Sequence, residues 1–254
     1  MNRYKAFAKV NIFLKITGMR ENYHTLTSRF MRVNHLFDTL WFEPKATPEF
    51  EIRGSFDCEI HSNTIYKAYK HLMASTRSHK LSDWMESHAV CVDKKIPSFA
   101  GLGGGSSDAA TFLRMCNAEL DLDLSIDELC EIGVNVGADV PFFIYDYQSA
   151  NVTGIGEIVE RFDEKTLDFE IVTPAIQIST PAVYRHYREH LYSPISAEEA
   201  IRLESTTSRE LLASTDPKEV NDLYAAALEH YPELTEKEGW FFSGSGSSFF
   251  RIKE

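Results

Sequence analysis

The sequence has little cysteine and no long apolar run, and each shortage excludes a class of protein. Its 254 residues include four cysteines, Cys58, Cys91, Cys116 and Cys130, and no two of them form a C-x-x-C pair. This spacing indicates neither a zinc knuckle nor a disulfide scaffold. No stretch is apolar for long enough to span a membrane, and the N-terminal residues lack the apolar region of a signal peptide. We therefore expect a cytoplasmic protein with reduced thiols.

Positive charge is also in short supply. The chain has 26 Lys and Arg residues against 38 Asp and Glu residues, which gives a formal net charge of −12. This balance argues against broad binding to nucleic acid or to an anionic membrane surface. An anionic small molecule would have to be held locally, by backbone N–H groups or by a few placed cations. With 43% hydrophobic residues, the chain can bury the core of one large domain or of two small ones.

Strand and helix signals occur in both halves of the chain. β-Branched and aromatic residues predict strands over residues 4–16, 38–43, 89–92 and 157–162, and a strand–turn–strand unit over 240–252. Capping boxes at 125–128 and 196–199, and the Thr180-Pro181 pair, predict helix starts. A mostly helical stretch reaches about residue 230. The pattern changes near residue 150, where we expect a domain boundary.

A glycine-rich loop stands out at residues 97–110, where four of the five residues from Gly101 to Gly105 are glycine. The loop follows a predicted strand and precedes a predicted helix, with Ser106 or Ser107 as the N-cap and Asp108 favourable near the helix N-terminus. It has no lysine where Walker A requires one, and Ser106 replaces the third glycine of the dinucleotide fingerprint. A phosphate cradle and a flexible turn both remain open at this point.

Three segments together resemble a known family. Residues 97–110 are similar to the second signature of the GHMP kinase superfamily, which includes galactokinase, homoserine kinase, mevalonate kinase and phosphomevalonate kinase. Residues 8–14 resemble its first signature and residues 244–248 its third. The resemblance implies a two-domain α+β GHMP kinase fold. Residues 1–149 would form a nucleotide-binding domain of the ribosomal protein S5 domain 2-like type, and residues 150–254 a ferredoxin-like C-terminal domain.

Two further elements narrow the resemblance. The segments Tyr23-His24-Thr25-Leu26 and 137–141, Gly-Ala-Asp-Val-Pro, are similar to superfamily members that phosphorylate a hydroxyl of a small molecule carrying a cytidine diphosphate group. The resemblance implies ATP as phosphoryl donor, with Mg²⁺ accompanying the nucleotide. It also implies a monomer or homodimer.

The resemblance assigns roles residue by residue. Asp139 would be the catalytic base, with Lys9 as its cationic partner. The positions matching ATP contacts are Gly101, Leu102, Gly103, Gly104, Gly105, Ser106, Ser107, Lys94 and Asn63. The positions matching substrate contacts are Asn11, Tyr23, His24, Tyr184 and Asp139. Asn11 follows Lys9 by two residues and shares its strand face, while Tyr23 and Tyr184 would stack on the base and His24 would bond to its edge.

Other interpretations stay open from the residues alone. Asp139 alone would be an ordinary turn residue, and core packing explains Tyr184 as well as stacking does. His186 and His190 share a helix face that can bind metal, but surface histidines without a third ligand are far commoner, so we expect no metal centre. The rival functions are a homoserine- or mevalonate-type kinase, a non-catalytic ATP-binding sensor, and a Rossmann dehydrogenase.

Overall fold

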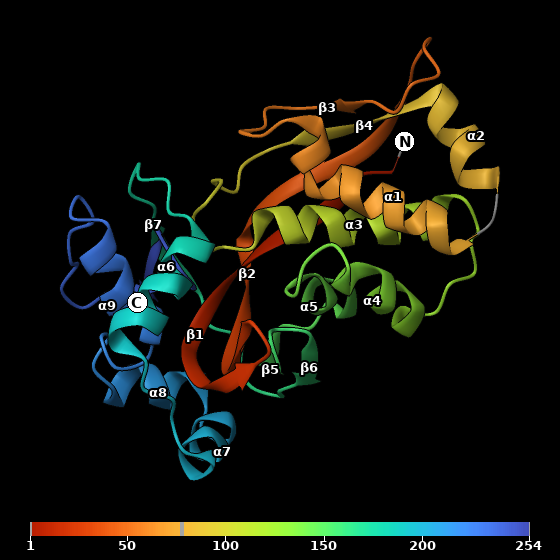
Figure 1. Ribbon diagram of the computed structural model, residues 1–254. Helices are drawn as coiled ribbons and strands as arrows, with labels where there is room; N and C mark the ends of the chain where they lie inside the picture. Colours follow the sequence, from red (N-terminus) through yellow and green to blue (C-terminus); the bar gives the residue numbers. More distant parts are fainter. Residues whose placement is uncertain (1, 77–78, 254) are drawn as a thin grey trace. The chain divides into compact units, whose positions relative to one another are not determined.

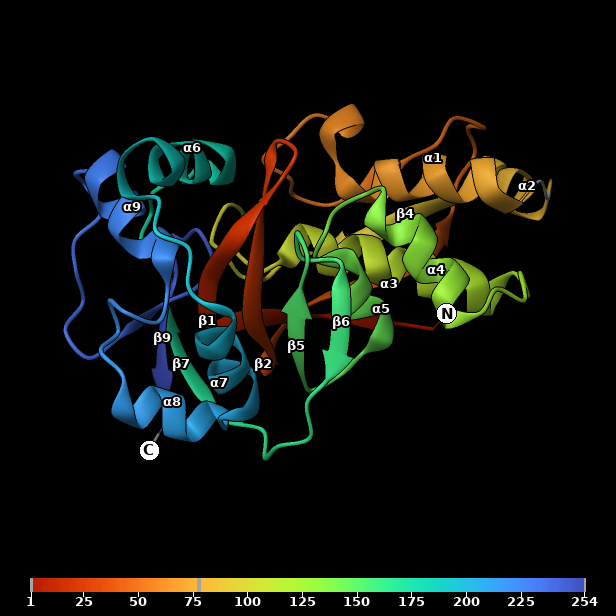
Figure 2. The same ribbon diagram turned by 60° about the horizontal axis from the view of Figure 1, so that its bottom comes forward.

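A computed structural model describes residues 2–76 and 79–253 (Figures 1 and 2). The chain divides into two compact units. Unit 1 contains Met1–Ala8, His35–Ser98 and Gly104–Asp146, and unit 2 contains Lys9–Asn34, Phe99–Gly103 and Tyr147–Glu254. Residues 9–34 and 99–103 thus group with the C-terminal part of the chain. The division into a nucleotide-binding domain of residues 1–149 and a C-terminal domain of residues 150–254 stays a prediction.

The strands of unit 1 centre on the second half of β2 (Tyr23–Pro44). This half pairs antiparallel with β4 (His88–Asp93), with Thr39 opposite Asp93 and Pro44 opposite His88. The short β3 (Ile52–Arg53) pairs parallel with β4. β4 has an apolar run that is buried from Ala89 to Val92, as expected for a strand covered on both faces.

Helices make up the rest of unit 1. A 3₁₀ helix, η1 (Ile60–Ser62), precedes α1 (Thr64–Thr76) and α2 (His79–Ser87), and α3 (Gly104–Glu119), α4 (Ile126–Val134) and α5 (Val140–Tyr145) follow β4. α1 and α5 both pack against α3, and α1 runs beside α3 in Figure 1. The central position of α3 explains why its apolar residues from Ala109 to Cys116, among them Phe112 and Leu113, are fully buried.

Unit 2 contains the remaining part of the two long strands, β1 and β2, with the strands that continue their sheet, and it also contains a separate second sheet. β1 (Tyr4–Arg20) pairs with β2, β2 pairs with β5 (Ser149–Thr153), and β5 pairs with β6 (Ile158–Arg161), the last two antiparallel. A second sheet has the order β7 (Phe169–Val172), β9 (Phe249–Ile252), β8 (Phe241–Phe242). The helical elements are α6 (Thr180–His186), the π-helical η2 (Tyr187–Leu191), α7 (Ala197–Ser205), α8 (Ser208–Ser214) and α9 (Asp222–His230).

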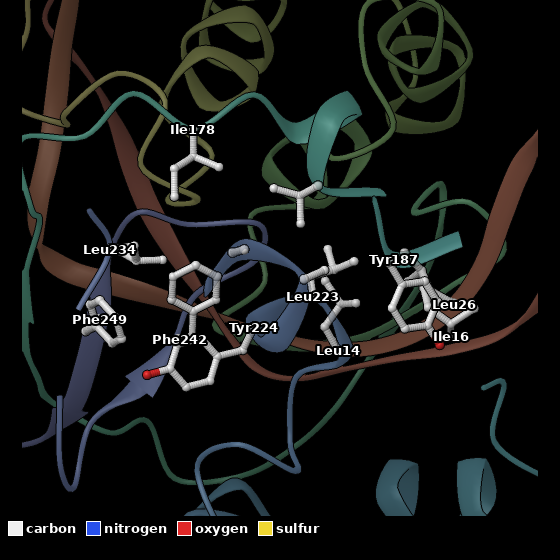
Figure 3. Close-up of a cluster of buried hydrophobic side chains, with 13 residues drawn as sticks. Leu14, Ile16, Leu26, Ile178, Tyr187, Leu223, Tyr224, Leu234, Phe242 and Phe249 are labelled. Atoms are coloured by element: carbon white, nitrogen blue, oxygen red, sulfur yellow. The ribbon is translucent and has the colours of Figure 1, made fainter. Parts of the chain in front are cut away.

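One apolar cluster joins these elements of unit 2 (Figure 3). Leu14 and Leu26 come from β1 and β2, while Tyr224 of α9 stacks on Phe242 of β8 with ring centroids 4.8 Å apart. Phe249 of β9 meets the edge of Phe242. The cluster fixes the two ends of the glycine–serine turn between β8 and β9.

Most predicted elements are present, with two corrected helix starts. Thr180 was predicted as an N-cap, but α6 already begins at Thr180, and Ser179 is its N-cap residue. The Ser125 capping box, the Ser196 cap and the strand–turn–strand unit near the C-terminus are confirmed. The prediction of Ser106 or Ser107 as N-cap was wrong, because α3 already begins at Gly104. Gly103 has φ +72, a left-handed conformation open to glycine, and this lets the helix begin directly after it. The described helices are all too short or too polar to cross a lipid bilayer.

A buried arginine ties several elements of unit 2 together. The side chain of Arg29 on β2 is fully buried, and its guanidinium lies 3.4 Å from the ring centroid of Phe162. Its Nε donates to Asn151 Oδ1 at 2.6 Å and its Nη2 to the Glu204 carbonyl at 2.7 Å. Nη1 also pairs with Glu164 Oε1 at 3.4 Å. A cation therefore satisfies a carbonyl at the C-terminal end of α7, where the helix dipole is negative.

We expect Arg29→Leu to lower the free energy of unfolding by about 3–5 kcal/mol, because it leaves Glu164 as a buried charge without its cation. Urea denaturation measures the loss. The control is Arg161→Leu, which removes an exposed pair with Asp163 and should cost at most about 1 kcal/mol. Equal losses of unfolding free energy in the two variants would show that the buried Arg29 stabilises the protein no more than an exposed ion pair does.

Candidate active site

The three family signatures meet within unit 2. Ser243, just before the third signature, donates through Oγ to the Gly101 carbonyl at 3.0 Å, and the backbone N–H of Ser248 donates to the Ala100 carbonyl at 3.1 Å. The backbone N–H of Lys9, in the first signature, donates to the Leu102 carbonyl at 3.0 Å. These bonds hold the first part of the glycine loop between β1 and the turn that joins β8 to β9.

Gly101 makes this contact possible. Its φ is +72, and a Cβ built on it would lie 2.0 Å from the Ser243 carbonyl oxygen. Real side chains never approach so closely, so any other residue at position 101 would push the two segments apart. The glycine run therefore serves close backbone approach here, which argues against the flexible-turn interpretation.

Lys9 and Asn11 lie together on β1, as their spacing predicted. Both are buried, with 4% and 2% of their surface exposed, and Lys9 Nζ donates to Asn11 Oδ1 at 2.6 Å. Nζ also lies 4.4 Å from the ring centroid of Phe30. Asn11 Nδ2 donates to Ser28 Oγ at 2.9 Å, which fixes the orientation of the amide. The lysine ammonium is thus held in one place within unit 2.

The second part of the glycine loop begins α3 in unit 1. Gly104, Gly105, Ser106 and Ser107 form the first turn of this 16-residue helix, so their N–H groups have no carbonyl partner within the helix. Thr64 at the start of α1 donates through Oγ1 to the Gly105 carbonyl at 2.6 Å. Four adjacent donors at the positive end of a helix dipole are suited to bind a phosphate.

Asn63, expected near ATP, lies beside this turn but is already bonded. Its Oδ1 accepts from the backbone N–H of Ile65 at 2.9 Å, a local bond at the start of α1. The following residue, Thr64, makes the contact with Gly105 described above. A nucleotide role for Asn63 stays a prediction.

Asp139 follows α4 and immediately precedes α5, in the same unit as the start of α3. A Cβ built on Gly137 would lie 3.7 Å from Ser106 Oγ, so the turn that carries Asp139 borders the predicted phosphate site. Asp139 has helical backbone angles, and its side chain makes no capping hydrogen bond to α5. Capping therefore does not explain the carboxylate. Asp139 and Lys9 belong to different units, and their partnership stays a prediction.

Lys94 lies beside the first residue of α3. Its Nζ donates to Asp38 Oδ2 at 2.5 Å and to Asp108 Oδ2 at 2.7 Å. A Cβ built on Gly104 would lie 3.6 Å from Nζ, so the ammonium borders the first residue of the helix. Sequence reasoning noted Asp108 only as an acid near the helix start and missed its bond with Lys94. It missed Asp38 altogether.

Of the predicted cytidine contacts, unit 2 brings His24 and Tyr184 together. Their ring centroids are 5.3 Å apart, and the rings of Tyr187 and Tyr192 lie 5.9 and 6.2 Å from the imidazole. His24 is buried, and its Nε2 has no hydrogen-bond partner among the residues that the structure describes. Burial, with a smaller contribution from the Arg188 charge, lowers the pKa of His24 below its usual 6.5. The imidazole is therefore neutral near pH 7.

Tyr23 takes the opposite side of β2. Successive residues of a strand point to opposite faces, and Tyr23 is 63% exposed while His24 is buried. Tyr184 also packs against the apolar cluster of unit 2, so the core-packing interpretation of this residue has structural support beside its contact with His24.

The histidines at i, i+4 spacing lie as the helix period predicts. The ring centroids of His186 and His190 are 4.5 Å apart, and His186 Nε2 lies 2.9 Å from Glu229 Oε2. Within residues 2–76 and 79–253, no group of three or more His, Cys, Asp and Glu side chains is arranged to hold a metal ion.

The chemistry at the start of α3 fits a nucleoside triphosphate. The first turn of α3 offers adjacent backbone donors and two serine hydroxyls, and the turn that carries the Asp139 carboxylate lies next to it. Such a set can bind phosphate oxygens and accept a proton from a hydroxyl. The features missed from sequence, such as Ser28 and Ser243, are ordinary serines whose partners lie far along the chain.

Known proteins resemble this chain over its full length. Residues 63–147 match the GHMP kinases N terminal domain. A Sulfurimonas denitrificans protein named 4-diphosphocytidyl-2-C-methyl-D-erythritol kinase is 55% identical over 260 residues, covering 100% of this chain and 98% of that protein. A Sulfurovum protein of the same name is 49% identical, with both chains fully covered.

Solved structures of GHMP kinases also resemble this chain. A crystal structure of 4-(cytidine 5'-diphospho)-2C-methyl-D-erythritol kinase aligns with a TM-score of 0.74 and 29% identity, covering 100% of this chain and 90% of the other. Methanococcus jannaschii mevalonate kinase aligns with a TM-score of 0.64 and 12% identity over 100% of this chain and 90% of its own, a likeness of fold alone. The α+β GHMP kinase fold is confirmed.

We expect Gly101→Ala to destabilise unit 2 far more than Gly239→Ala. Both glycines have nearly the same positive φ, +72 and +73, but a Cβ at 239 would meet nothing within 4 Å. The backbone cost of about 1 kcal/mol is therefore common to both variants, and the difference measures the contact with Ser243. Urea denaturation and the KM for ATP should both change at position 101 only. Matching stabilities would contradict the close approach.

Proposed function

The chain belongs to the 4-diphosphocytidyl-2-C-methyl-D-erythritol kinase family of the GHMP kinases, and from this we propose its reaction and the residues that perform it. The protein transfers the terminal phosphoryl group of ATP to the 2-hydroxyl of 4-diphosphocytidyl-2-C-methyl-D-erythritol, a step of the non-mevalonate route to isoprenoid precursors. The observation that carries this proposal is the meeting of the three signatures around Gly101, Lys9 and Ser243.

The loop residues hold the triphosphate of ATP. The N–H groups of Gly104, Gly105, Ser106 and Ser107 point along the start of α3, and the contacts of Gly101 and Leu102 fix the chain just before it. Backbone donors suit a chain with a net charge of −12, because they bind anions without added side-chain cations. Mg²⁺ would neutralise charge on the phosphates, and its ligands are not assigned.

Asp139 and Lys9 act on the hydroxyl of the substrate. Asp139 accepts or directs the hydroxyl proton as the phosphoryl group arrives, and the Lys9 ammonium keeps this carboxylate ionised. Asn11 holds Lys9 by the 2.6 Å bond and positions the substrate beside it. The support for Asp139 is its place in the turn that borders Ser106.

The cytidine binds to His24 and Tyr184. A neutral imidazole can donate from one nitrogen and accept at the other, which matches the edge of a cytosine ring. The unpartnered Nε2 supports this role, and Tyr184 offers an aromatic face beside it. Tyr23 is exposed at the start of β2 on the face opposite His24, and its stacking on the base stays a prediction.

Finer features of fold and setting belong to the same proposal. The antiparallel sheet β7–β9–β8 with α6 and α9 supports a ferredoxin-like second domain, and the remaining sheet with α1 and α3 supports an S5-like first domain. A cytoplasmic location and a monomer or homodimer stay predictions.

Two measurements separate this function from its alternatives. ATP consumption that requires the diphosphocytidyl substrate, and not homoserine or mevalonate, supports the proposal. Consumption with either control alcohol would favour another GHMP kinase, while ATP binding without turnover on any of the three would favour a sensor.

We expect Asp139→Asn to lower kcat about 10²-fold or more, because the amide cannot take the hydroxyl proton, with little change in binding of ATP or substrate. Lys9→Ala should also lower kcat through lost charge stabilisation. If the two residues act as a unit, the double variant loses less than the product of the single losses. A folded Asp139→Asn enzyme with the parent kcat would remove Asp139 from the mechanism.

We expect His24→Phe to raise the KM for the diphosphocytidyl substrate roughly tenfold, the effect of one lost buried hydrogen bond, with an unchanged KM for ATP. The exposed His190→Phe is the control. In the parent enzyme, the lowered pKa of His24 should shift the loss of substrate affinity on acidification to a lower pH than an ordinary histidine would give, as the imidazole gains a proton. A substrate KM that does not respond to His24→Phe would return this residue to a packing role.

A further inference from the structure

Three ionisable side chains are buried together beside the start of α3. Asp38 of β2 and Asp108 of α3 have 0% and 3% of their surface exposed. Both carboxylates accept from the same ammonium, Lys94 Nζ, at 2.5 and 2.7 Å. The cluster therefore contains two acids and one base, and it carries a net negative charge when both acids are ionised.

The cluster is fixed to the backbone that leads into the glycine loop. Asp38 Oδ1 accepts from the backbone N–H groups of Lys95 and Ile96 at 2.5 and 2.8 Å. Ile96 in turn lies against Gly104, where a Cβ would come within 2.8 Å of Ile96 Cγ2. The three side chains thus support the first residue of the turn that is expected to hold phosphate.

Asp108 is the unbalanced member of this cluster. Its Oδ2 accepts from Lys94, but its Oδ1 is buried with no hydrogen-bond partner within residues 2–76 and 79–253. Burial raises the pKa of Asp108 to about 7, the Lys94 ammonium opposes this rise, and the nearby Asp38 carboxylate adds to it. Near neutral pH, the carboxylate exchanges a proton with solvent.

Other polar groups around α3 make contacts away from Asp108. α1 reaches the helix start through the uncharged hydroxyl of Thr64, which donates to the Gly105 carbonyl. On α4 and α5, Tyr145 Oη donates to Asp127. Lys94 and Asp38 are therefore the charges whose effects on Asp108 the structure identifies.

We propose that Asp108 is a positioning residue whose protonation is linked to ATP binding, so that the protein takes up a proton at Asp108 Oδ1 when the triphosphate binds at the start of α3. An ionised Asp108 places a negative charge one turn from the N–H groups that bind phosphate. The two anions then repel each other and compete for the same helix dipole. The proton comes from solvent and forms an O–H bond at Oδ1, no bond between heavy atoms changes, and the neutral carboxyl keeps its second oxygen for Lys94. The inference rests on the proposed ATP site.

The test compares ATP affinity in the parent protein and in Asp108→Asn from about pH 5.5 to about pH 8.5, without acceptor substrate. In the parent, affinity should fall roughly tenfold over this range because of the added charge. In Asp108→Asn, which mimics the neutral acid, it should stay near the acidic value of the parent. The terminal phosphate of ATP titrates in the same range, but its contribution is common to both proteins and cancels in the comparison.

The matched control is Asp93→Asn. Asp93 lies at the end of β4 and pairs with Lys95 at 3.1 Å, but its side chain is 50% exposed. This variant should retain the pH dependence of the parent. Calorimetry in two buffers of different ionisation enthalpy gives a second measurement on the unmodified protein, which should show proton uptake that rises towards neutral pH.

Two results would overturn the inference. The first is an equal pH dependence of ATP affinity in the parent and in Asp108→Asn. The second is proton uptake by the parent on ATP binding that is no greater than the uptake by ATP itself. Either result in an enzyme that still phosphorylates the diphosphocytidyl substrate refutes the role of Asp108 and leaves the proposed function standing. A folded parent that binds no ATP at any pH refutes both.

Discussion

The close approach of the Gly101 and Ser243 backbones is the contact on which the candidate site depends. It joins a loop in the middle of the chain to a turn near its end, and the Lys9 backbone adds the N-terminal strand through the Leu102 carbonyl. Apart from the bond from Ser243 Oγ, these contacts are made by main chain, so the path of the loop depends little on side-chain rotamers. Phosphate donors that belong to the backbone need such a path, since they cannot reorient as side chains do.

The charge balance of the chain explains why the site takes this form. With a net charge of −12, the protein has no general attraction for an anion, so binding must come from short-range donors. Its buried cations have defined partners in the structure: Lys9 bonds to Asn11, Arg29 to Asn151 and Glu204, and Lys94 to two carboxylates. Each buried cation is therefore fixed in place, and the phosphate site relies chiefly on N–H groups.

Local chemistry decides which features the sequence alone predicts. The Ser125 capping box and the shared face of Lys9 and Asn11 depend on neighbours a few residues away, so both follow from spacing. The start of α3 was placed too late because serine is the usual N-cap, whereas the left-handed Gly103 allows an earlier start. The sequence did not predict the buried role of Arg29, because its partners on β5 and at the end of α7 are brought near only by the fold.

The two carboxylates buried beside the glycine loop differ in what they contribute to the structure. Asp38 alone would give Lys94 one carboxylate and would still fix the backbone of Lys95 and Ile96. A second buried carboxylate at Asp108 adds desolvation cost without a second cation to offset it. A group that is unfavourable when charged and satisfied by one proton is sensitive to any further negative charge nearby. In this fold, the adjacent surface is the helix start at which an anion is expected to bind.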